Sequence, residues 1–227
     1  MEIKFMDSIK DSQIFKILNE ISNMNIVKLC HNERYLHHYF TEKIQKEYPI
    51  IYNDLNKSKL HPEWATVIKN RRIGGKYKKS GNEYKIDNGN GTSGFIDFVL
   101  GDYDKPEMGI EFKFCKSWNF QSLVFDYMKL LDSDNSIQKV ISFSIIYREK
   151  ELSNQLTLEK IKETITVLKK RLDGKLDINR EFLLWIIEIA PNSKKEQKRS
   201  WFCENLEINF IEDTPSSKIE NKKLNIA

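Results

Sequence analysis

Residues 108–115 read MGIEFKFC, an apolar run that is interrupted by Glu111 and Lys113. Alternate side chains of a β-strand point to opposite faces of the sheet. The isoleucine and the two phenylalanines would therefore share one face, and Glu111 and Lys113 would share the other. Charged groups inside an apolar strand are costly to bury unless they pair or bind a metal ion. The pattern predicts a core strand that carries a carboxylate and an ammonium group for chemistry.

A second apolar run, FIDFVL at residues 95–100, contains Asp97 as its only charged residue. The short segment GDYDKPE joins the two runs, so the strands are expected to be neighbours and Asp97 to meet Glu111 across the ladder. Two carboxylates a few ångströms apart make a site for a hard cation such as Mg²⁺. A cation held there can polarise a phosphoryl oxygen and activate water.

The tripeptide alone is weak, because this lysine-rich sequence contains six matches to an acidic residue, any residue and lysine. Only those that begin at Glu83 and Glu111 lie in strand-like surroundings. The copy at Glu83 has polar flanks and loops on both sides. The copy at Glu111 has apolar flanks, Asp97 upstream and a helical pattern downstream, and we therefore favour it as the functional one.

The remaining periodicity predicts one α/β domain over residues 1–212, with a mixed central sheet flanked by helices. The tail 213–227 is polar and is expected to be disordered. Helices are predicted at 8–22, 32–47, 118–132 and 156–172, and strands at 62–69, 83–86, 95–100, 108–115, 138–147, 182–190 and 206–211.

Composition excludes several classes of protein. The three cysteines are Cys30, Cys115 and Cys203, which are too far apart for a zinc knuckle and odd in number, so reduced thiols are expected. No apolar run reaches the roughly 20 residues of a membrane span, and the start of the chain lacks a signal peptide, so a cytoplasmic protein without membrane contact is predicted. A net charge of +4 permits nucleic-acid binding without arguing for it.

Asp97 followed by Glu111-Phe112-Lys113 resembles the PD-(D/E)XK nuclease superfamily, although Ile96 stands where many members have proline. The resemblance implies a restriction-endonuclease-like core in the order α-β-β-β-α-β. It implies that Asp97 and Glu111 bind Mg²⁺, for which Mn²⁺ can substitute, and that Lys113 is the catalytic lysine. Many members also use a glutamate of the first core helix, which fits Glu33. Many have polar residues on the helix after the motif, for which Gln121, Asp126 and Lys129 are the candidates here.

Each weaker candidate has an ordinary structural alternative. Glu33 could simply begin a helix, and Asp126 could pair with Lys129 three residues later. Glu63 could reach the site or cap the end of a strand, and the histidines are interpreted as surface or packing residues. A basic segment could hold a phosphate backbone or be a solvated loop. Its cations are Arg71, Arg72, Lys76, Lys78 and Lys79.

The sequence thus predicts a metal-dependent endonuclease that hydrolyses phosphodiester bonds in DNA, of the kind used in restriction or defence. A homodimer would suit cleavage of both strands. The alternative is a catalytically silent protein with a nuclease fold that binds nucleic acid or a protein partner. No glycine-rich phosphate loop, dinucleotide fingerprint or nucleophile elbow supports a third class.

Overall fold

The computed structural model describes the parts of the chain from which the fold and the site are built. The described residues are 12–24, 33–66, 76–80, 83–87, 93–115, 120–147, 179–190, 197–204 and 207–211, with separate positions at 163, 167, 170, 172 and 174–177. The predicted tail at 213–227 and most of the predicted helix at 156–172 lie outside them.

The first described helix is α2 (Gln13–Asn23), and it begins at a side-chain cap. The Phe15 N–H donates to the side-chain oxygen of Ser12 over 3.2 Å, which satisfies one of the N–H groups that a helix start leaves free. Its buried face consists of isoleucine and leucine residues with one serine. This is the helix predicted at 8–22, of which residues 8–11 lie outside the described part.

The second described helix is α4 (Glu33–Ile44), which is shorter than the predicted range of 32–47. Its buried residues are Leu36, Phe40 and Ile44, four apart, so they form one stripe on the helix surface. The helix ends at Ile44, and the next turn closes when the Tyr48 N–H donates to the Ile44 carbonyl over 2.9 Å. Pro49 follows and prevents continuation, because the residue before a proline avoids the helical region.

Seven strands form one sheet in the order β1-β4-β5-β6-β7-β8-β9. β5, β6 and β7 are mutually parallel, and the other neighbours are antiparallel. The pattern of the sequence predicts the mixed sheet but does not predict β8. The strands are β1 (Leu60–Ala65), β4 (Phe95–Gly101), β5 (Pro106–Cys115), β6 (Lys139–Tyr147), β7 (Glu181–Ala190), β8 (Gln197–Glu204) and β9 (Glu207–Ile211).

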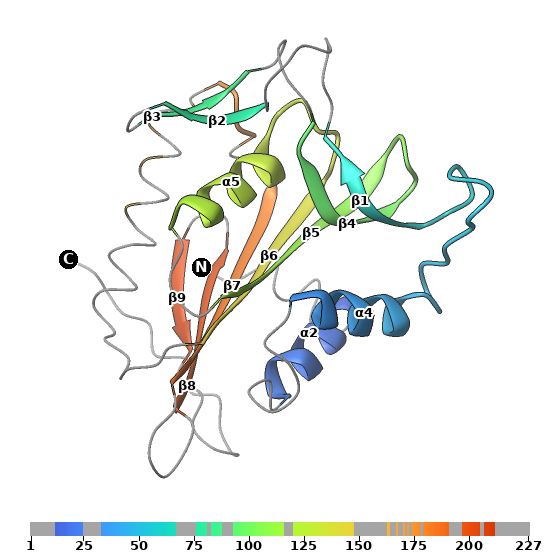
Figure 1. The fold of residues 1–227 in the computed structure, drawn as a ribbon, viewed down its shortest axis with the longest axis horizontal. Helices are drawn as coiled ribbons and strands as arrows, with labels where there is room; N and C mark the ends of the chain where they lie inside the picture. The colour runs from blue at the N-terminus through green and yellow to red at the C-terminus, as the bar shows by residue number, and fades with distance from the viewer. Residues whose placement is uncertain are drawn as a thin grey trace.

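Helices cover both faces of this sheet, as predicted (Figure 1). α2 and α4 pack on one face, where Ile110 and Phe112 of β5 join their apolar residues in a common core. α5 (Phe120–Leu131) packs on the other face, against Val140 of β6 and Leu184 of β7. The alternation in MGIEFKFC therefore holds: the apolar side chains of β5 face α2 and α4, and Glu111 belongs to the face that α5 covers.

A separate hairpin of β2 (Tyr77–Ser80) and β3 (Glu83–Ile86) lies beside α5 (Figure 1). A buried ion pair attaches it, because Lys76 Nζ lies 2.6 Å from Asp132 Oδ2 and both side chains are fully buried. Tyr77 adds a second link, since its hydroxyl donates to Asp132 Oδ2 over 2.8 Å. The prediction that Lys76 contacts DNA is wrong, because its ammonium group is buried against a carboxylate.

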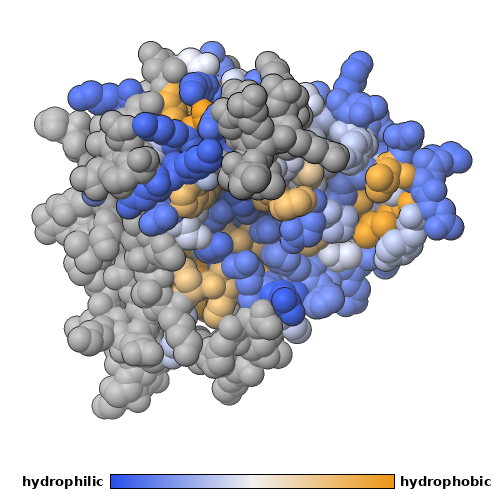
Figure 2. Space-filling model, turned by 45° about the horizontal axis from the view of Figure 1, so that its top comes forward, coloured by the Kyte–Doolittle hydropathy of each residue, from blue (hydrophilic) through white to orange (hydrophobic). Residues whose placement is uncertain are grey.

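Among the helices of the described residues, none combines the length and the apolar character that crossing a membrane requires. On the face shown in Figure 2, hydrophilic side chains predominate among the described residues, and the hydrophobic ones form separate small patches.

Removing one partner of the buried pair should be costly. Lys76→Met leaves the carboxylate of Asp132 buried without its cation, so we expect the free energy of unfolding to fall by about 3–5 kcal/mol. Lys57→Met removes an exposed lysine that pairs with Asp54 over 3.1 Å and should cost at most about 1 kcal/mol. Urea unfolding followed by circular dichroism measures both, and equal losses would contradict the structural role of Lys76.

Candidate active site

β4 and β5 separate at the position where the predicted catalytic residues lie. The last pair between them at this end joins Phe98 to Ile110, so Asp97 and Glu111 are the next residues along the two strands. Strand β1, the other neighbour of β4, has an irregular backbone at this position, because Glu63 has a positive φ of 51°. Pro62 pairs with Phe98 and Trp64 pairs with Ile96, which leaves Glu63 opposite Asp97.

Beyond its last pair with β4, strand β5 has two main-chain N–H groups that donate to carboxylates. The Phe112 N–H donates to Asp97 Oδ2 over 2.7 Å, and the Phe114 N–H donates to Glu33 Oε2 over 2.9 Å. Hydrogen bonds to a charged acceptor contribute about 1.5–3 kcal/mol each. Asp97 and Glu33 are thereby fixed along the edge of β5, although they come from a strand and a helix far apart in the sequence.

On the α5 face, acidic and basic side chains alternate in a connected network. Lys129 Nζ lies 2.7 Å from Glu111 Oε1 and 3.1 Å from Asp126 Oδ1. Lys113 Nζ lies 3.6 Å from Asp126 Oδ2 and 4.0 Å from Glu33 Oε2. Asp126 therefore stands between two ammonium groups, and Lys129 is the lysine that holds Glu111.

Burial dominates the ionisation of these carboxyl groups. It raises the pKa of Glu111 well above its usual value, against the opposing effect of Lys129, and the nearby charges of Asp126 and Asp97 raise it further. Burial raises the pKa of Asp126 in the same way. For Lys129, burial lowers the pKa, but Glu111 and Asp126 outweigh it and the net change is upward. The site thus favours bound positive charge.

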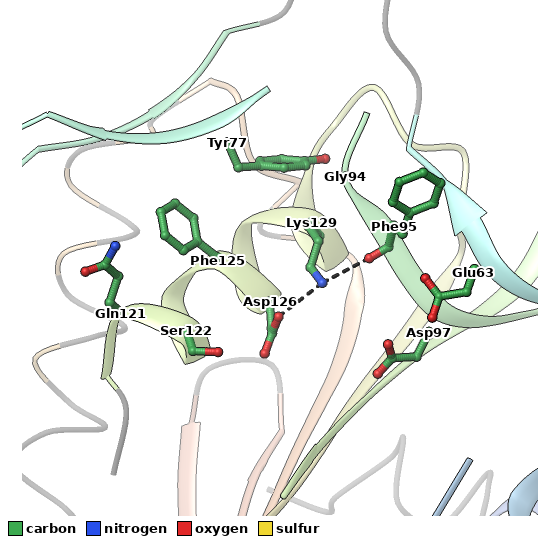
Figure 3. Close-up of a pocket in the computed structure, with 10 residues that line it drawn as sticks. All are labelled: Glu63, Tyr77, Gly94, Phe95, Asp97, Gln121, Ser122, Phe125, Asp126 and Lys129. Carbon is green, nitrogen blue, oxygen red and sulfur yellow. Dashed lines mark hydrogen bonds and ion pairs between the residues drawn. The ribbon is translucent and has the colours of Figure 1, made fainter. Parts of the chain in front are cut away.

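A pocket of about 740 Å³ opens beside this network, between β4, α5 and the hairpin. Figure 3 shows the carboxylates of Glu63 and Asp97 facing each other at one end and Gln121 at the other end. Lys129 reaches between them, and its Nζ donates to the Phe95 carbonyl over 3.0 Å. The wall next to the hairpin needs Gly94, because a Cβ there would lie 2.7 Å from the Tyr77 ring.

A second group of possible metal ligands includes Asp97. His37 of α4, Glu63 of β1 and Asp97 of β4 each offer one ligand atom, and these atoms lie within 4.8 Å of one another. His37 Nε2 lies 3.5 Å from Asp97 Oδ2. Burial alone would lower the pKa of His37, but Asp97, Glu33 and Glu63 raise it above its usual value. The carboxylates of this corner therefore favour the protonated form of His37.

The structure brings together Glu33, Asp97, Glu111, Lys113 and Asp126, and it places Gln121 on the rim of the pocket with an exposed side chain. Of the predicted DNA-binding residues, the structure describes Lys76, Lys78 and Lys79. Arg71 and Arg72 lie outside the described residues, and Lys76 is buried. Lys78 pairs with Asp87 over 3.0 Å, and the exposed Lys79 lies over the Tyr84 ring.

The sequence pattern underrates His37 and Glu63, and it leaves the role of Lys129 open. His37 has no metal-binding spacing of histidines around it, so the pattern indicates only a surface or packing residue. Glu63 stays ambiguous between the site and a strand end. Lys129 is a candidate from the resemblance, with a simple pairing to Asp126 as its alternative, because their spacing puts both on one helix face. This spacing is the one sequence signal that links any of the three residues to the site, because His37, Glu63 and Lys129 lie on three different elements.

Comparison of the chain with protein-family models, with curated proteins and with solved structures finds no significant match. No neighbour therefore assigns a role to any of these side chains. The chemistry of the site is inferred from its own residues and from their geometry.

The raised pKa of Glu111 should make the metal-free protein less stable as pH rises. Above about pH 4.5, Glu111 loses its proton in the unfolded chain but keeps it in the folded one. The free energy of unfolding therefore falls as pH rises, until the pH reaches the pKa of Glu111 in the folded chain. As pH rises from 5 to 7.5 in EDTA, Glu111→Gln should therefore gain stability relative to the unmodified chain, on top of a cost, largely independent of pH in this range, of leaving Lys129 without its carboxylate. Urea unfolding measures the gain. Glu107→Gln, at an exposed carboxyl of the same strand, should show none.

Proposed function

We propose that this chain is a metal-dependent endonuclease that hydrolyses phosphodiester bonds in DNA. The observation that carries the proposal is the meeting of Asp97, Glu111 and two lysines beside one open pocket, at the point where β4 and β5 separate. The order of the described elements around it supports the restriction-endonuclease-like core. A helix, three strands of the sheet, a helix and a strand follow one another as α4, β1, β4, β5, α5 and β6.

The residues present fit a divalent cation. Glu33, Glu63, Asp97, Glu111 and Asp126 supply five carboxyl groups against the ammonium groups of Lys113 and Lys129. Carboxylate oxygens are ligands that Mg²⁺ and Mn²⁺ accept. Burial keeps Glu111 difficult to ionise, and a nearby dication would relieve that cost as the ammonium group of Lys129 does in part.

In this proposal Asp97 and Glu111 hold the cation, with Mg²⁺ as the expected ion and Mn²⁺ as a substitute. A bound dication of this kind polarises a phosphoryl oxygen and lowers the pKa of a coordinated water. The protein's own ammonium groups then stabilise charge that develops on the phosphate. Lys129 is the better placed of the two, because it lines the pocket and contacts Glu111, whereas Lys113 is turned toward Asp126 and Glu33.

The surface beside the pocket supports a polyanionic substrate. Strand β2 of the hairpin contributes Tyr77 to the pocket wall, and Lys78 and Lys79 are the next two residues of the same strand. Phe95 lines the same pocket and is 51% exposed as a residue, enough for a planar base to contact it. A phosphate backbone that follows the hairpin would bring a phosphodiester to the carboxylates.

The proposal predicts cleavage of plasmid DNA in Mg²⁺ or Mn²⁺ and none in excess EDTA. Glu111→Ala should lower the rate by at least about 10²-fold, because a metal ligand contributes several kcal/mol to the transition state. Glu107→Ala removes an exposed carboxyl from the same strand and should cut at the original rate. Gel analysis of nicked and linear plasmid measures all three.

Two results would overturn this function. One is full cleavage by Glu111→Ala, which would trace the activity to a contaminant or to another site. The other is a mobility shift with DNA but no cutting with either metal, which would favour a silent protein that only binds nucleic acid. Unfolding measurements on each variant separate a loss of activity from a loss of fold.

A further inference from the structure

His37 packs against two phenylalanine rings and holds one ring nitrogen beside Asp97. Its ring packs edge-on against Phe98 at 5.2 Å and tilted against Phe112 at 5.6 Å between centroids. The Nε2 atom is buried and makes no hydrogen bond of good geometry among the described residues, although Asp97 Oδ2 lies 3.5 Å away. A buried polar atom left this way is costly, and an imidazole so held is an ordered ligand before any ion arrives.

Glu63 supplies a carboxylate from the edge strand on the opposite side. It is exposed, and no ion-pair partner of it occurs in the described part of the chain. A φ of 51° costs a residue with a side chain about 1–3 kcal/mol, and such strain is commonly kept where it aims a functional group. Here the conformation leaves Glu63 facing Asp97, two like charges that only a cation would favour (Figure 3).

We propose that His37, Glu63 and Asp97 together bind a first-row transition-metal dication, with selectivity over Mg²⁺. Their three ligand atoms already lie within 4.8 Å of one another, close enough to share one ion. Oxygen ligands alone suit Mg²⁺ and Ca²⁺, whereas an imidazole nitrogen favours transition metals, of which Mn²⁺ also accepts carboxylates. Three protein ligands leave positions open for water and for an oxygen of the substrate.

This site deepens the proposed function and rests on it only for the role of the ion in cleavage. Asp97 would belong both to this ligand set and to the pair with Glu111, so the ion would lie beside the pocket proposed to receive the phosphate. The alternative is a simple ion pair, in which a protonated His37 neutralises Asp97 and Glu63 takes no part. The two arrangements differ in what they predict for metal affinity.

The test is metal binding to the full chain after removal of metal with EDTA. Free Mn²⁺ is measured by its paramagnetic resonance signal, and Mg²⁺ is titrated by calorimetry. We expect Mn²⁺ to bind at least roughly tenfold more tightly than Mg²⁺, because of the imidazole ligand. His37→Ala should weaken Mn²⁺ binding by about 10–100-fold and reduce its advantage over Mg²⁺. His38→Ala, at the exposed next residue of the same helix, should change neither affinity.

Glu63→Gln keeps the inference testable if His37→Ala disturbs the packing around its ring. Its side chain is exposed, so the fold should survive, and Mn²⁺ affinity should fall as for His37→Ala. Unchanged Mn²⁺ affinity in both variants, or equal affinity of the original chain for Mn²⁺ and Mg²⁺, would overturn the site. Tight Mn²⁺ binding without DNA cleavage would overturn the proposed function and leave this site in place. Metal-dependent cleavage with unchanged Mn²⁺ binding in both variants would overturn this site and leave the proposed function in place.

Discussion

The separation of β4 from β5 at Asp97 is the feature on which the site depends. A strand that loses its neighbour exposes N–H groups, and buried donors must find acceptors. Here the acceptors are the carboxylates of Asp97 and Glu33, on the N–H groups of Phe112 and Phe114. The same hydrogen bonds that complete the edge of β5 therefore bring two acidic groups to one place.

Charge balance explains the ion-pair network on the face of the sheet that α5 covers. Glu111 is buried on the α5 face, and Lys129, 2.7 Å away, offsets part of the cost of charging it. Asp126 then lies between Lys129 and Lys113, which keeps both ammonium groups near the sheet. Such a network is held together only as a whole, since removing one member leaves another buried charge without a partner. The same ion pairs thus stabilise the fold and form the candidate site.

Local pattern predicts much of the fold because it reports which face of an element is buried. The alternation in MGIEFKFC indicates the orientation of β5, and the apolar run of residues 138–147 predicts a strand within one residue of β6. Where pairing depends on distant residues, the pattern fails. In the sequence, Lys76 belongs to a segment that resembles a solvated basic loop, and only the tertiary structure shows its side chain buried against Asp132. β8 escapes prediction because its sequence, QKRSWFCE, begins with four polar residues and shows neither alternation nor a long apolar run.

The sequence by itself determined that Asp97, Glu111 and Lys113 share a sheet and that Glu111 and Lys113 share a face. Period-two alternation and a short connection between two strands suffice for that. Only the tertiary structure decided which groups complete the site. His37, Glu63 and Lys129 reach it from a helix, an edge strand and a second helix, and no spacing in one chain segment encodes such a meeting. Their convergence follows from packing two helical layers against a sheet that opens at Asp97.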